Sequence, residues 1–507
     1  MSLGRCLAVS LIGVEGHLVQ VEADIAPGLP SFTLVGLPDT AVVESRDRVR
    51  AASANSGCPV PPRRITVNLS PAALPKAGTA FDLAVAAALL AAAGAVPADA
   101  VEGCLHLGEL GLDGSLRPVT GVLPAVLAAA RAGVRRAVVA PANLAEATLV
   151  PEVAVVAVSS LEELVRLHRG LTPGTATAPQ APARVPAPAD PDLRDVIGQA
   201  DGRRALEIAA AGGHHLFLLG PPGAGKTMLA ARLPGLLPDL VPSESLEVTA
   251  VHSVSGTLGE ATSLITRPPF EDPHHTSSMT ALVGGGTGIA RPGAASRAHR
   301  GVLFLDEAPE FGARALDALR QPLEQGRLSI HRAKGVAHYP ARFQLVLAAN
   351  PCPCGRYSGG RKDCECSPLI RRRYLARLSG PLLDRVDLRV ELLPVGTVTA
   401  ATGEPPEASA VVRARVAQAR ERQRRRWRRQ GWGTNGEAPG AVIRALDLPR
   451  GATRDLDTAL QSTLISLRGY DRVLRVAWTI ADLAGLEAPG RKQVGEALTL
   501  RGREVAS

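Results

Sequence analysis

A glycine-rich segment that ends in a lysine and a threonine is the strongest chemical signal in the sequence. Residues 216–227 read LFLLGPPGAGKT, which matches the pattern G-x-x-x-x-G-K-[ST] between an apolar run and a helix-forming run at 228–233. The glycines let backbone N–H groups turn toward phosphate oxygens, and the start of the following helix adds positive potential. The pattern predicts a phosphate loop formed by Gly220, Pro221, Pro222, Gly223, Ala224, Gly225, Lys226 and Thr227.

Four side chains in and beyond this loop have the chemistry for ATP hydrolysis. We expect Lys226 to reach the β- and γ-phosphates of ATP and the Thr227 hydroxyl to ligate Mg²⁺. A second apolar run ends in Asp306 and Glu307, at the strand end where open α/β sheets bind ligands. We expect Asp306 to hold the Mg²⁺ shell and Glu307 to orient and polarise the attacking water. An acidic pair can also be a helix N-cap, but its place downstream of the loop favours catalysis.

Three short apolar runs must position these groups. They lie at 216–219, 302–305 and 344–349 with helical segments between them, which predicts a parallel sheet with crossover helices. The third run ends in Asn350, whose amide is suited to hold the same water as Glu307. The sequence therefore predicts an α/β core with its polar groups gathered at one edge.

Four of the seven cysteines follow Asn350 in the spacing C-x-C-x9-C-x-C; they are Cys352, Cys354, Cys364 and Cys366. Four thiolates on one short loop can close a tetrahedral Zn²⁺ site, and glycines within the loop make this feasible. The spacing is less specific than C-x-x-C. Reduced free thiols and a redox pair therefore remain alternatives.

Length and composition set the frame for this core. The chain has 507 residues, enough for three or four domains, and 46% of them are hydrophobic, which excludes collagen-like repeats and wholesale disorder. The net charge of +9 is compatible with an anionic partner without requiring one. No apolar stretch is long enough to span a bilayer, and the start has no signal cleavage site. We expect a cytoplasmic protein with no membrane partner.

A proline-rich stretch divides the chain. Residues 172–191 hold six prolines and predict an extended linker. The expected units are an N-terminal domain at 1–170, a linker at 171–191, the nucleotide-binding core at 192–395 and a C-terminal helical lid at 396–507. Further expected elements are strands at 64–69 and 137–140, helices at 82–93, 122–132 and 411–430, and two helices within 456–486.

The motifs resemble those of AAA+ ATPases, and more narrowly those of the magnesium-chelatase-like family typified by the ComM and YifB proteins. The resemblance covers essentially the whole chain. It rests on PHHTSSMTALVGGG at 273–286, RPG at 291–293, AHRGVLFLDE at 298–307 and SGPLLDRVD at 379–387. It implies an α/β P-loop AAA+ core with a helical lid of the magnesium-chelatase C-terminal type, ATP and Mg²⁺ as cofactors, and self-association into a ring, a hexamer in the family.

The resemblance also implies roles for two arginines. Arg385, in the Leu-Leu-Asp-Arg motif, matches the arginine finger that enters a neighbouring subunit's ATP site and stabilises charge on the transferred phosphoryl group. Arg475 matches the second sensor on the helical lid, with Arg468 and Arg472 nearby as competitors. The alternative for both is a surface ion pair.

The first 170 residues resemble a Lon-protease-like (ribosomal S5 domain 2-like) α+β domain. The matching stretches are LPKAGTAFDLA at 74–84 and LGELGLDGSLRPVTG at 107–121. The active protease uses a Ser–Lys dyad, whereas the corresponding region here carries Thr79 and residues 122–126 contain no lysine. A threonine without its base is poorly activated, so we expect a non-proteolytic scaffold.

A basic hairpin is the candidate DNA contact. Residues 326–339 form two alternating runs joined by a turn with Arg332, Lys334 and Gly335. In related hexameric ATPases such a hairpin projects into the ring pore, where Arg332 and Lys334 can follow a phosphate backbone. The alternative is an ordinary solvated hairpin.

Two further segments have no single interpretation. Residues 413–429 hold nine arginines, with Trp427 and Trp432 close by, and could bind nucleic acid by charge and stacking or could be a solvated helix. His274 and His275 are equally compatible with a nucleotide or pore contact and with a polar loop.

The leading hypothesis is an ATP-hydrolysing ring motor that acts on single-stranded or branched DNA, with helicase or branch-migration activity in recombination or natural transformation as the resemblance implies. The alternative is a chelatase-like ATPase that remodels a protein or inserts a metal. A passive nucleotide-binding scaffold is disfavoured because the hydrolytic residues Asp306, Glu307, Asn350 and Arg385 are all present.

Overall fold

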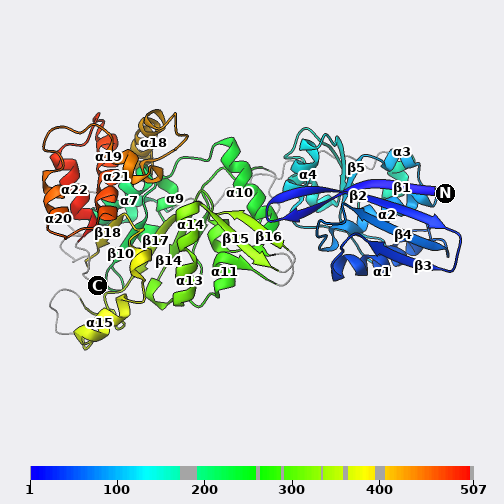
Figure 1. Cartoon of the computed structure of the whole chain (residues 1–507), viewed down its shortest axis with the longest axis horizontal. Helices are drawn as coiled ribbons and strands as arrows, with labels where there is room; N and C mark the ends of the chain where they lie inside the picture. Colours follow the sequence, from blue (N-terminus) through cyan, green and yellow to red (C-terminus); the bar gives the residue numbers. More distant parts are fainter. Residues whose placement is uncertain are drawn as a thin grey trace.

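The computed structural model of the protein describes residues 2–171, 191–258, 263–286, 290–332, 335–357, 364–393 and 406–502. Nearly all of the expected linker lies outside these residues, as do Lys334 and the expected boundary between core and lid at 395/396. The described residues form an N-terminal unit, a central unit and a C-terminal group of helices arranged in a row (Figure 1). No described helix is long and apolar enough to cross a bilayer.

The N-terminal unit is built on a seven-stranded sheet in the order β3-β4-β2-β1-β5-β8-β9. Its strands are β1 (Ser2–Ile12), β2 (Glu15–Ala26), β3 (Ser31–Val35), β4 (Arg64–Ser70), β5 (Cys104–Leu107), β8 (Arg136–Val139) and β9 (Ala154–Ala157), with a small pair β6 (Glu109–Leu110) and β7 (Leu116–Arg117). Its helices are α1 (Thr40–Asn55), α2 (Asp82–Ala92), α3 (Ala98–Val101), α4 (Val122–Arg131), α5 (Leu144–Ala147) and α6 (Leu161–His168). The strands expected at 64–69 and 137–140 and the helices expected at 82–93 and 122–132 are confirmed to within one residue.

The stretch expected to lack a catalytic lysine is the first part of α4. Val122, Leu123 and Val126 are buried there, and the Leu123 N–H donates to Glu146 Oε1 at 2.8 Å. This part of the unit is thus an apolar helix start whose backbone is satisfied by a carboxylate. The first part of α4 therefore holds packing side chains.

Two histidines buried in the N-terminal unit predict a pH dependence of its stability. His106 Nε2 and His168 Nε2 lie 3.0 Å apart, and burial lowers the pKa of His106 to about 3 and that of His168 to about 4. The unfolded chain then binds more protons than the folded one, so stability falls as the pH drops from about 6.5 toward about 4. We expect a loss of roughly 2–3 kcal/mol for each histidine over this range.

Thermal unfolding at about pH 7 and about pH 5 checks this prediction, with His168→Gln as the comparison. The variant removes one of the two titrating rings, so its midpoint should change less between the two pH values than that of the parent. Equal changes in both proteins would contradict the assignment.

The central unit contains a five-stranded sheet in the order β11-β14-β17-β10-β18, in which every pair is parallel. Its strands are β10 (Leu216–Leu219), β11 (Phe270–Glu271), β14 (Val302–Leu305), β17 (Gln344–Ala349) and β18 (Leu388–Glu391). Its helices are α7 (Ala200–Gly212), α8 (Lys226–Ala230), α9 (Leu233–Leu236), α10 (Pro242–Ser255), α11 (Met279–Val283), α12 (Ala294–Arg297), α13 (Ala313–Ala318), α14 (Arg320–Gln325), α15 (Pro368–Leu375) and α16 (Gly380–Leu383). The three expected strands are confirmed with their bounds, whereas β11 and β18 are findings of the structure.

Two antiparallel pairs accompany this sheet. β12 (Gly284–Gly285) pairs with β13 (Arg291–Pro292), and β15 (Arg327–Arg332) pairs with β16 (Gly335–Pro340) as the expected hairpin. The hairpin lies beside the N-terminal unit (Figure 1). There Gly13, in the turn between β1 and β2, lies so close that a Cβ atom would be 2.3 Å from the His338 carbonyl oxygen. His338 pairs with Ser329, so the N-terminal unit contacts the hairpin between its base and its tip.

A second contact joins the N-terminal unit to α10. Ser253 Oγ donates to Glu146 Oε1, and the Gly121 N–H donates to the Ser253 carbonyl at 3.2 Å. Burial raises the pKa of Glu146, although Ser253 and backbone N–H groups oppose this. The contact links Glu146 of α5 and the start of α4 in one unit to α10 of the other.

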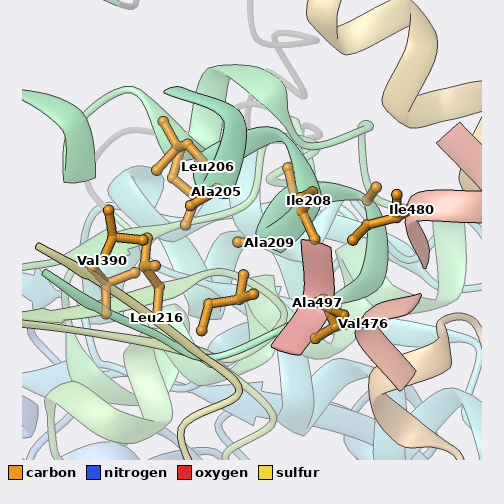
Figure 2. Packing of buried hydrophobic residues seen from close by; sticks show 14 of the residues in the cluster. Ala205, Leu206, Ile208, Ala209, Leu216, Val390, Val476, Ile480 and Ala497 are labelled. Carbon is orange, nitrogen blue, oxygen red and sulfur yellow. The ribbon is translucent and has the colours of Figure 1, made fainter. Parts of the chain in front are cut away.

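The C-terminal group packs on the central sheet through α7. Its helices are α18 (Ser409–Arg426), α19 (Gly440–Arg444), α20 (Arg454–Gln461), α21 (Leu467–Ala484) and α22 (Arg491–Arg501). Figure 2 shows Ile208 of α7 beside Ile480 of α21, within a cluster that also contains Leu216 of β10 and Ala497 of α22. One continuous apolar core therefore holds the C-terminal helices against the sheet. The expected helix at 411–430 is present as α18 but ends at Arg426, four residues early. The two helices expected within 456–486 are confirmed as α20 and α21, and α22 is an addition.

The stacking role considered for Trp427 is wrong. Its ring is only 1% exposed, and its Nε1 donates to Asn435 Oδ1 at 2.9 Å. Arg426 of the same segment forms an ion pair of 2.6 Å with the buried Asp482. The aromatic ring and part of the positive charge thus hold α18 on α21, because α18 lies against the core.

Candidate functional site

The phosphate loop joins the end of β10 to the start of α8. The Gly220 N–H donates to the Ala349 carbonyl at 3.1 Å, which ties the loop to the end of β17. Gly223 and Gly225 have φ angles of +77° and +86°, in the left-handed region that glycine adopts without strain. The loop conformation at these two positions would therefore be strained for any residue with a Cβ atom.

The Lys226 ammonium lies among oxygen atoms of the loop. Its Nζ donates to the Gly220 carbonyl at 2.7 Å, to the Pro221 carbonyl at 3.0 Å and to Asn350 Oδ1 at 2.9 Å. Burial lowers the pKa of Lys226, and the carboxylates of Asp306 and Glu307 partly oppose this shift. Two residues predicted separately, Lys226 and Asn350, are therefore in direct contact.

The two predicted Mg²⁺ ligands also touch each other. Thr227 Oγ1 donates to Asp306 Oδ2 at 2.6 Å, and the other carboxylate oxygen, Oδ1, accepts the Glu307 N–H at 2.8 Å. A hydroxyl and a carboxylate are the oxygen donors that Mg²⁺ prefers beside phosphate groups. The donor set at the end of β14 therefore fits a magnesium ion.

Glu307 has an unusual backbone for its residue type. Its φ angle is +50°, a left-handed conformation that non-glycine residues adopt mainly where the surrounding structure imposes it, often at functional sites. Its side chain is 48% exposed, and Glu307 Oε2 lies 3.3 Å from His275 Nδ1. The structure thus places a solvent-accessible carboxylate beside the Mg²⁺ donors.

Two contacts near the loop did not follow from the sequence. Gln199 Nε2 donates to the Ala224 carbonyl at 2.9 Å and to the Leu393 carbonyl at 2.6 Å, and so holds the phosphate loop from the start of α7. No motif points to Gln199, because these contacts join segments 25 and 194 residues apart. His275 was left open by the sequence, and its contact with Glu307 places it at the site.

The two predicted arginines lie elsewhere. Arg385 and Arg475 line a pocket of about 160 Å³ together with His215 and Asp387. His215 directly precedes β10 and Asp387 directly precedes β18, so the pocket is at the amino ends of the parallel strands. Among the described residues that line it, none belongs to the phosphate loop.

Positive charge is concentrated in this arginine pocket. Arg385 forms an ion pair with Glu324, and Arg472 forms one of 2.6 Å with Asp387. Burial, followed by the charges of neighbouring arginines, lowers the pKa of Arg385, and burial also lowers the pKa of Arg475. The Nε atoms of Arg385, Arg472 and Arg475 are buried without a hydrogen-bond partner. The pocket therefore has unused donors that suit an anionic group.

The buried carboxylate of Asp387 anchors the pocket. Burial alone would raise its pKa, but the charge of Arg472 and the nearby His214, whose Nδ1 lies 3.7 Å from Asp387 Oδ2, hold this pKa well below its usual range. Asp387 Oδ2 also accepts the His215 N–H at 3.0 Å. The carboxylate thereby fixes Arg472 at the start of β10.

The remaining predicted residues lie outside both places. Arg332 is exposed at the end of β15, where it pairs with Gly335 across the hairpin tip, and its neighbour Lys334 lies outside the described residues. The Sγ atoms of Cys352, Cys354, Cys364 and Cys366 all lie within 4.8 Å of one another, just beyond Asn350.

Comparison with known proteins identifies the family. The profile described as magnesium chelatase, subunit ChlI, matches residues 192–399; the profiles described as subunit ChlI of Mg-chelatase and as its C-terminal part match residues 21–143 and 406–501. The chain is 56% identical to an uncharacterized protein of Mycobacterium tuberculosis, with 99% of both chains covered. It is 43% identical to the uncharacterized protein YifB of Escherichia coli, covering 99% of this chain and 97% of YifB. It is 44% identical to the competence protein ComM of Haemophilus influenzae, covering 99% of this chain and 98% of ComM.

This chain belongs to the magnesium-chelatase-like ComM/YifB family. The mixed α/β structure with its parallel central sheet fits the P-loop AAA+ fold of that family. A stretch of 150 residues is also 31% identical to Lon protease 2 of Bacillus subtilis, covering 28% of this chain and 26% of that protein. This partial match gives the Lon-like interpretation of the family's N-terminal unit only weak support.

Proposed function

We propose that this protein is an ATP-hydrolysing ring motor that acts on DNA, in helicase or branch-migration steps of recombination or natural transformation. The observation that carries the proposal is the separation of two incomplete sites, the phosphate loop at one edge of the central sheet and the arginine pocket at the other. β10 between them has four residues, a length of about 13 Å. An arginine at one edge thus needs another subunit to meet a nucleotide.

ATP would bind with its phosphates in the loop. There the phosphate oxygens would replace the protein oxygens that now accept hydrogen bonds from Lys226. Mg²⁺, held by Thr227 and Asp306, neutralises charge on the phosphates when it is bound. Glu307 is placed to accept a proton from water, and its contact with His275 orients its carboxylate. Asn350, which holds Lys226, is suited to position the same water.

The charge that develops on the transferred phosphoryl group needs a further cation. In our proposal Arg385 of one subunit supplies it at the loop of the next, and Arg475 lies in the same pocket to assist. Head-to-tail contacts of this kind close into a ring when the rotation allows it, and a hexamer is the form expected for the family.

DNA is the substrate favoured by the basic hairpin and by one relative. Arg332 is exposed at the hairpin tip while the N-terminal unit contacts the hairpin at His338, an arrangement that suits a contact of the tip with a phosphate backbone. ComM carries the name competence protein, which favours a role in the handling of incoming DNA. The ATP hydrolysis rate with and without single-stranded, duplex and branched DNA at low salt tests this. No stimulation by any of them would overturn the DNA motor.

The second candidate is a chelatase-like ATPase that remodels a polypeptide. The family profile described by a magnesium chelatase subunit favours it. ATP hydrolysis that is indifferent to DNA but is stimulated by a folded protein substrate would support this candidate.

Arg332→Ala tests the hairpin. We expect the DNA concentration needed for half-maximal stimulation of ATP hydrolysis to rise by about threefold to tenfold, because one phosphate contact is lost, and we expect the salt dependence of DNA binding to become shallower. Arg131→Ala, on the exposed surface of α4 in the N-terminal unit, is the matched control. The same shift in both variants would show that general charge, and not the hairpin, is responsible.

A further inference from the structure

We infer that the four cysteines after Asn350 form a Zn²⁺ site that fixes this segment against the phosphate loop. The four residues are Cys352, Cys354, Cys364 and Cys366, and no other group of at least three metal-binding side chains is found among the described residues. The Zn²⁺ site is independent of the proposal that the protein acts on DNA. Its expected effect on nucleotide binding rests on the proposed function of the phosphate loop.

The sulfur geometry matches tetrahedral zinc. Cys352 Sγ lies 3.3 Å from Cys354 Sγ and 3.7 Å from Cys364 Sγ, and the last two atoms are also 3.7 Å apart. Zn–S bonds of about 2.3 Å in a tetrahedron place the sulfurs about 3.8 Å from one another. The side chains thus converge at the spacing that one shared ion requires.

The backbone holds the first pair in this arrangement. The Gly355 N–H donates to the Cys352 carbonyl at 3.0 Å, which closes a tight turn and turns both thiols to the same side. Gly355 has a φ angle of +73°, so glycine suits this turn. A turn that projects two cysteines together is one half of a four-cysteine zinc site.

The other two interpretations explain less. All four cysteines are free, and the shortest sulfur separation of 3.3 Å is far beyond a disulfide bond of about 2.05 Å. A redox pair needs two cysteines and leaves the convergence of the other two unexplained. Four protonated thiols form only weak hydrogen bonds with one another, which does not explain why they cluster. Four thiolates can instead complete the coordination of one Zn²⁺.

The cluster lies directly beside the nucleotide site. Cys352 is two residues after Asn350, which holds Lys226, and its side chain is fully buried. Gly355 packs on the phosphate loop so closely that a Cβ atom would be 2.7 Å from Cγ and Cδ of Pro222. A metal that fixes the turn at Cys352 and Gly355 would thereby hold both Asn350 and Pro222 in place.

Metal analysis of the full-length protein tests the site. We expect about one zinc per chain in the parent and in Cys58→Ser, a partly exposed cysteine of the N-terminal unit, and a loss of most zinc in Cys364→Ser. Cys364 is preferred to Cys352 because it is only partly buried, so serine is tolerated more easily. Equal zinc in Cys364→Ser and the parent would overturn the site.

The parent itself gives a second measurement that needs no variant. X-ray absorption at the zinc edge should show four sulfur neighbours at about 2.3 Å. The four cluster thiols, identified by mass spectrometry of labelled peptides, should react with a thiol reagent only after a chelator is added. Zinc bound by nitrogen or oxygen, or cluster thiols that react at once, would overturn the proposal.

The affinity for a fluorescent ATP analogue tests the contact with the loop. Removing zinc should weaken binding by about tenfold, and adding zinc back should restore it. Gly355→Ala should also weaken binding, because the added methyl meets Pro222 and the φ angle of +73° strains the turn that carries Cys352. Unchanged affinity after zinc removal would overturn the inference that the Zn²⁺ site fixes the segment against the phosphate loop. ATP hydrolysis that does not respond to DNA would contradict the proposed DNA motor but not the zinc site.

Discussion

Replacing Glu307 by glutamine is expected to lower the kcat for ATP hydrolysis by about 10²–10⁴-fold while leaving ATP binding close to that of the parent. Glutamine keeps the size of the side chain but cannot accept a proton from water. The phosphate contacts come from Lys226 and the loop, which the change does not touch. Steady-state hydrolysis and equilibrium binding of a fluorescent ATP analogue measure the two effects separately.

Glu310→Gln is the matched control for this change. Glu310 is three residues away and forms an ion pair of 2.8 Å with Arg377, so the control removes a nearby carboxylate with no place at the phosphate loop. We expect its hydrolysis rate to stay within about twofold of the parent, because partly exposed ion pairs contribute little. Normal hydrolysis by Glu307→Gln would show that another group activates the water.

Arg385→Ala is expected to lower kcat by about 10³–10⁵-fold, the usual contribution of an arginine supplied to a phosphoryl transfer. ATP binding should be retained, because the arginine pocket and the phosphate loop are at opposite edges of the sheet. The ion pair of Arg385 with Glu324 is also lost, so thermal unfolding must show that the variant is folded. Hydrolysis at the parent's rate would make Arg385 a structural ion pair only.

Mixing two inactive proteins tests whether Arg385 acts between subunits. Lys226→Ala lacks the loop cation and Arg385→Ala lacks the pocket arginine, but a mixed ring contains interfaces with both groups intact. Random mixing in equal amounts makes about a quarter of the sites complete, so activity should reappear. Mixing Arg385→Ala with a protein that carries both changes is the control and should stay inactive. A failure of the first mixture to recover activity, with subunit exchange verified, would place the arginine in its own subunit's site.

The nucleotide-binding side of the core could be predicted because its signals are local. The phosphate loop is one contiguous segment, and the strands that carry Asp306 and Asn350 are short apolar runs whose ends the sequence shows directly. Parallel strands bring such ends to one edge. The contacts of Thr227 with Asp306 and of Lys226 with Asn350 are the result.

Other features depended on packing between distant segments. α18 is rich in arginine and its sequence suggests a solvated helix, yet Trp427 at its end is buried because α18 packs against α7 and α21. Gln199 carries no motif, and its contact with the phosphate loop exists only once α7 has folded against β10. In such cases the side chain's role is set by the element that lies against it.

The sequence by itself determined the family, the phosphate loop, the carboxylate pair and the candidate metal cysteines, since each is a set of residue types at fixed local spacing. Only the tertiary structure decided where the arginines lie. Arg385 lies just before β18, and the packing of α21 on α7 brings Arg475 to the same amino ends of the strands. Because the phosphate loop is at the carboxyl ends, one chain holds two half-sites that face away from each other.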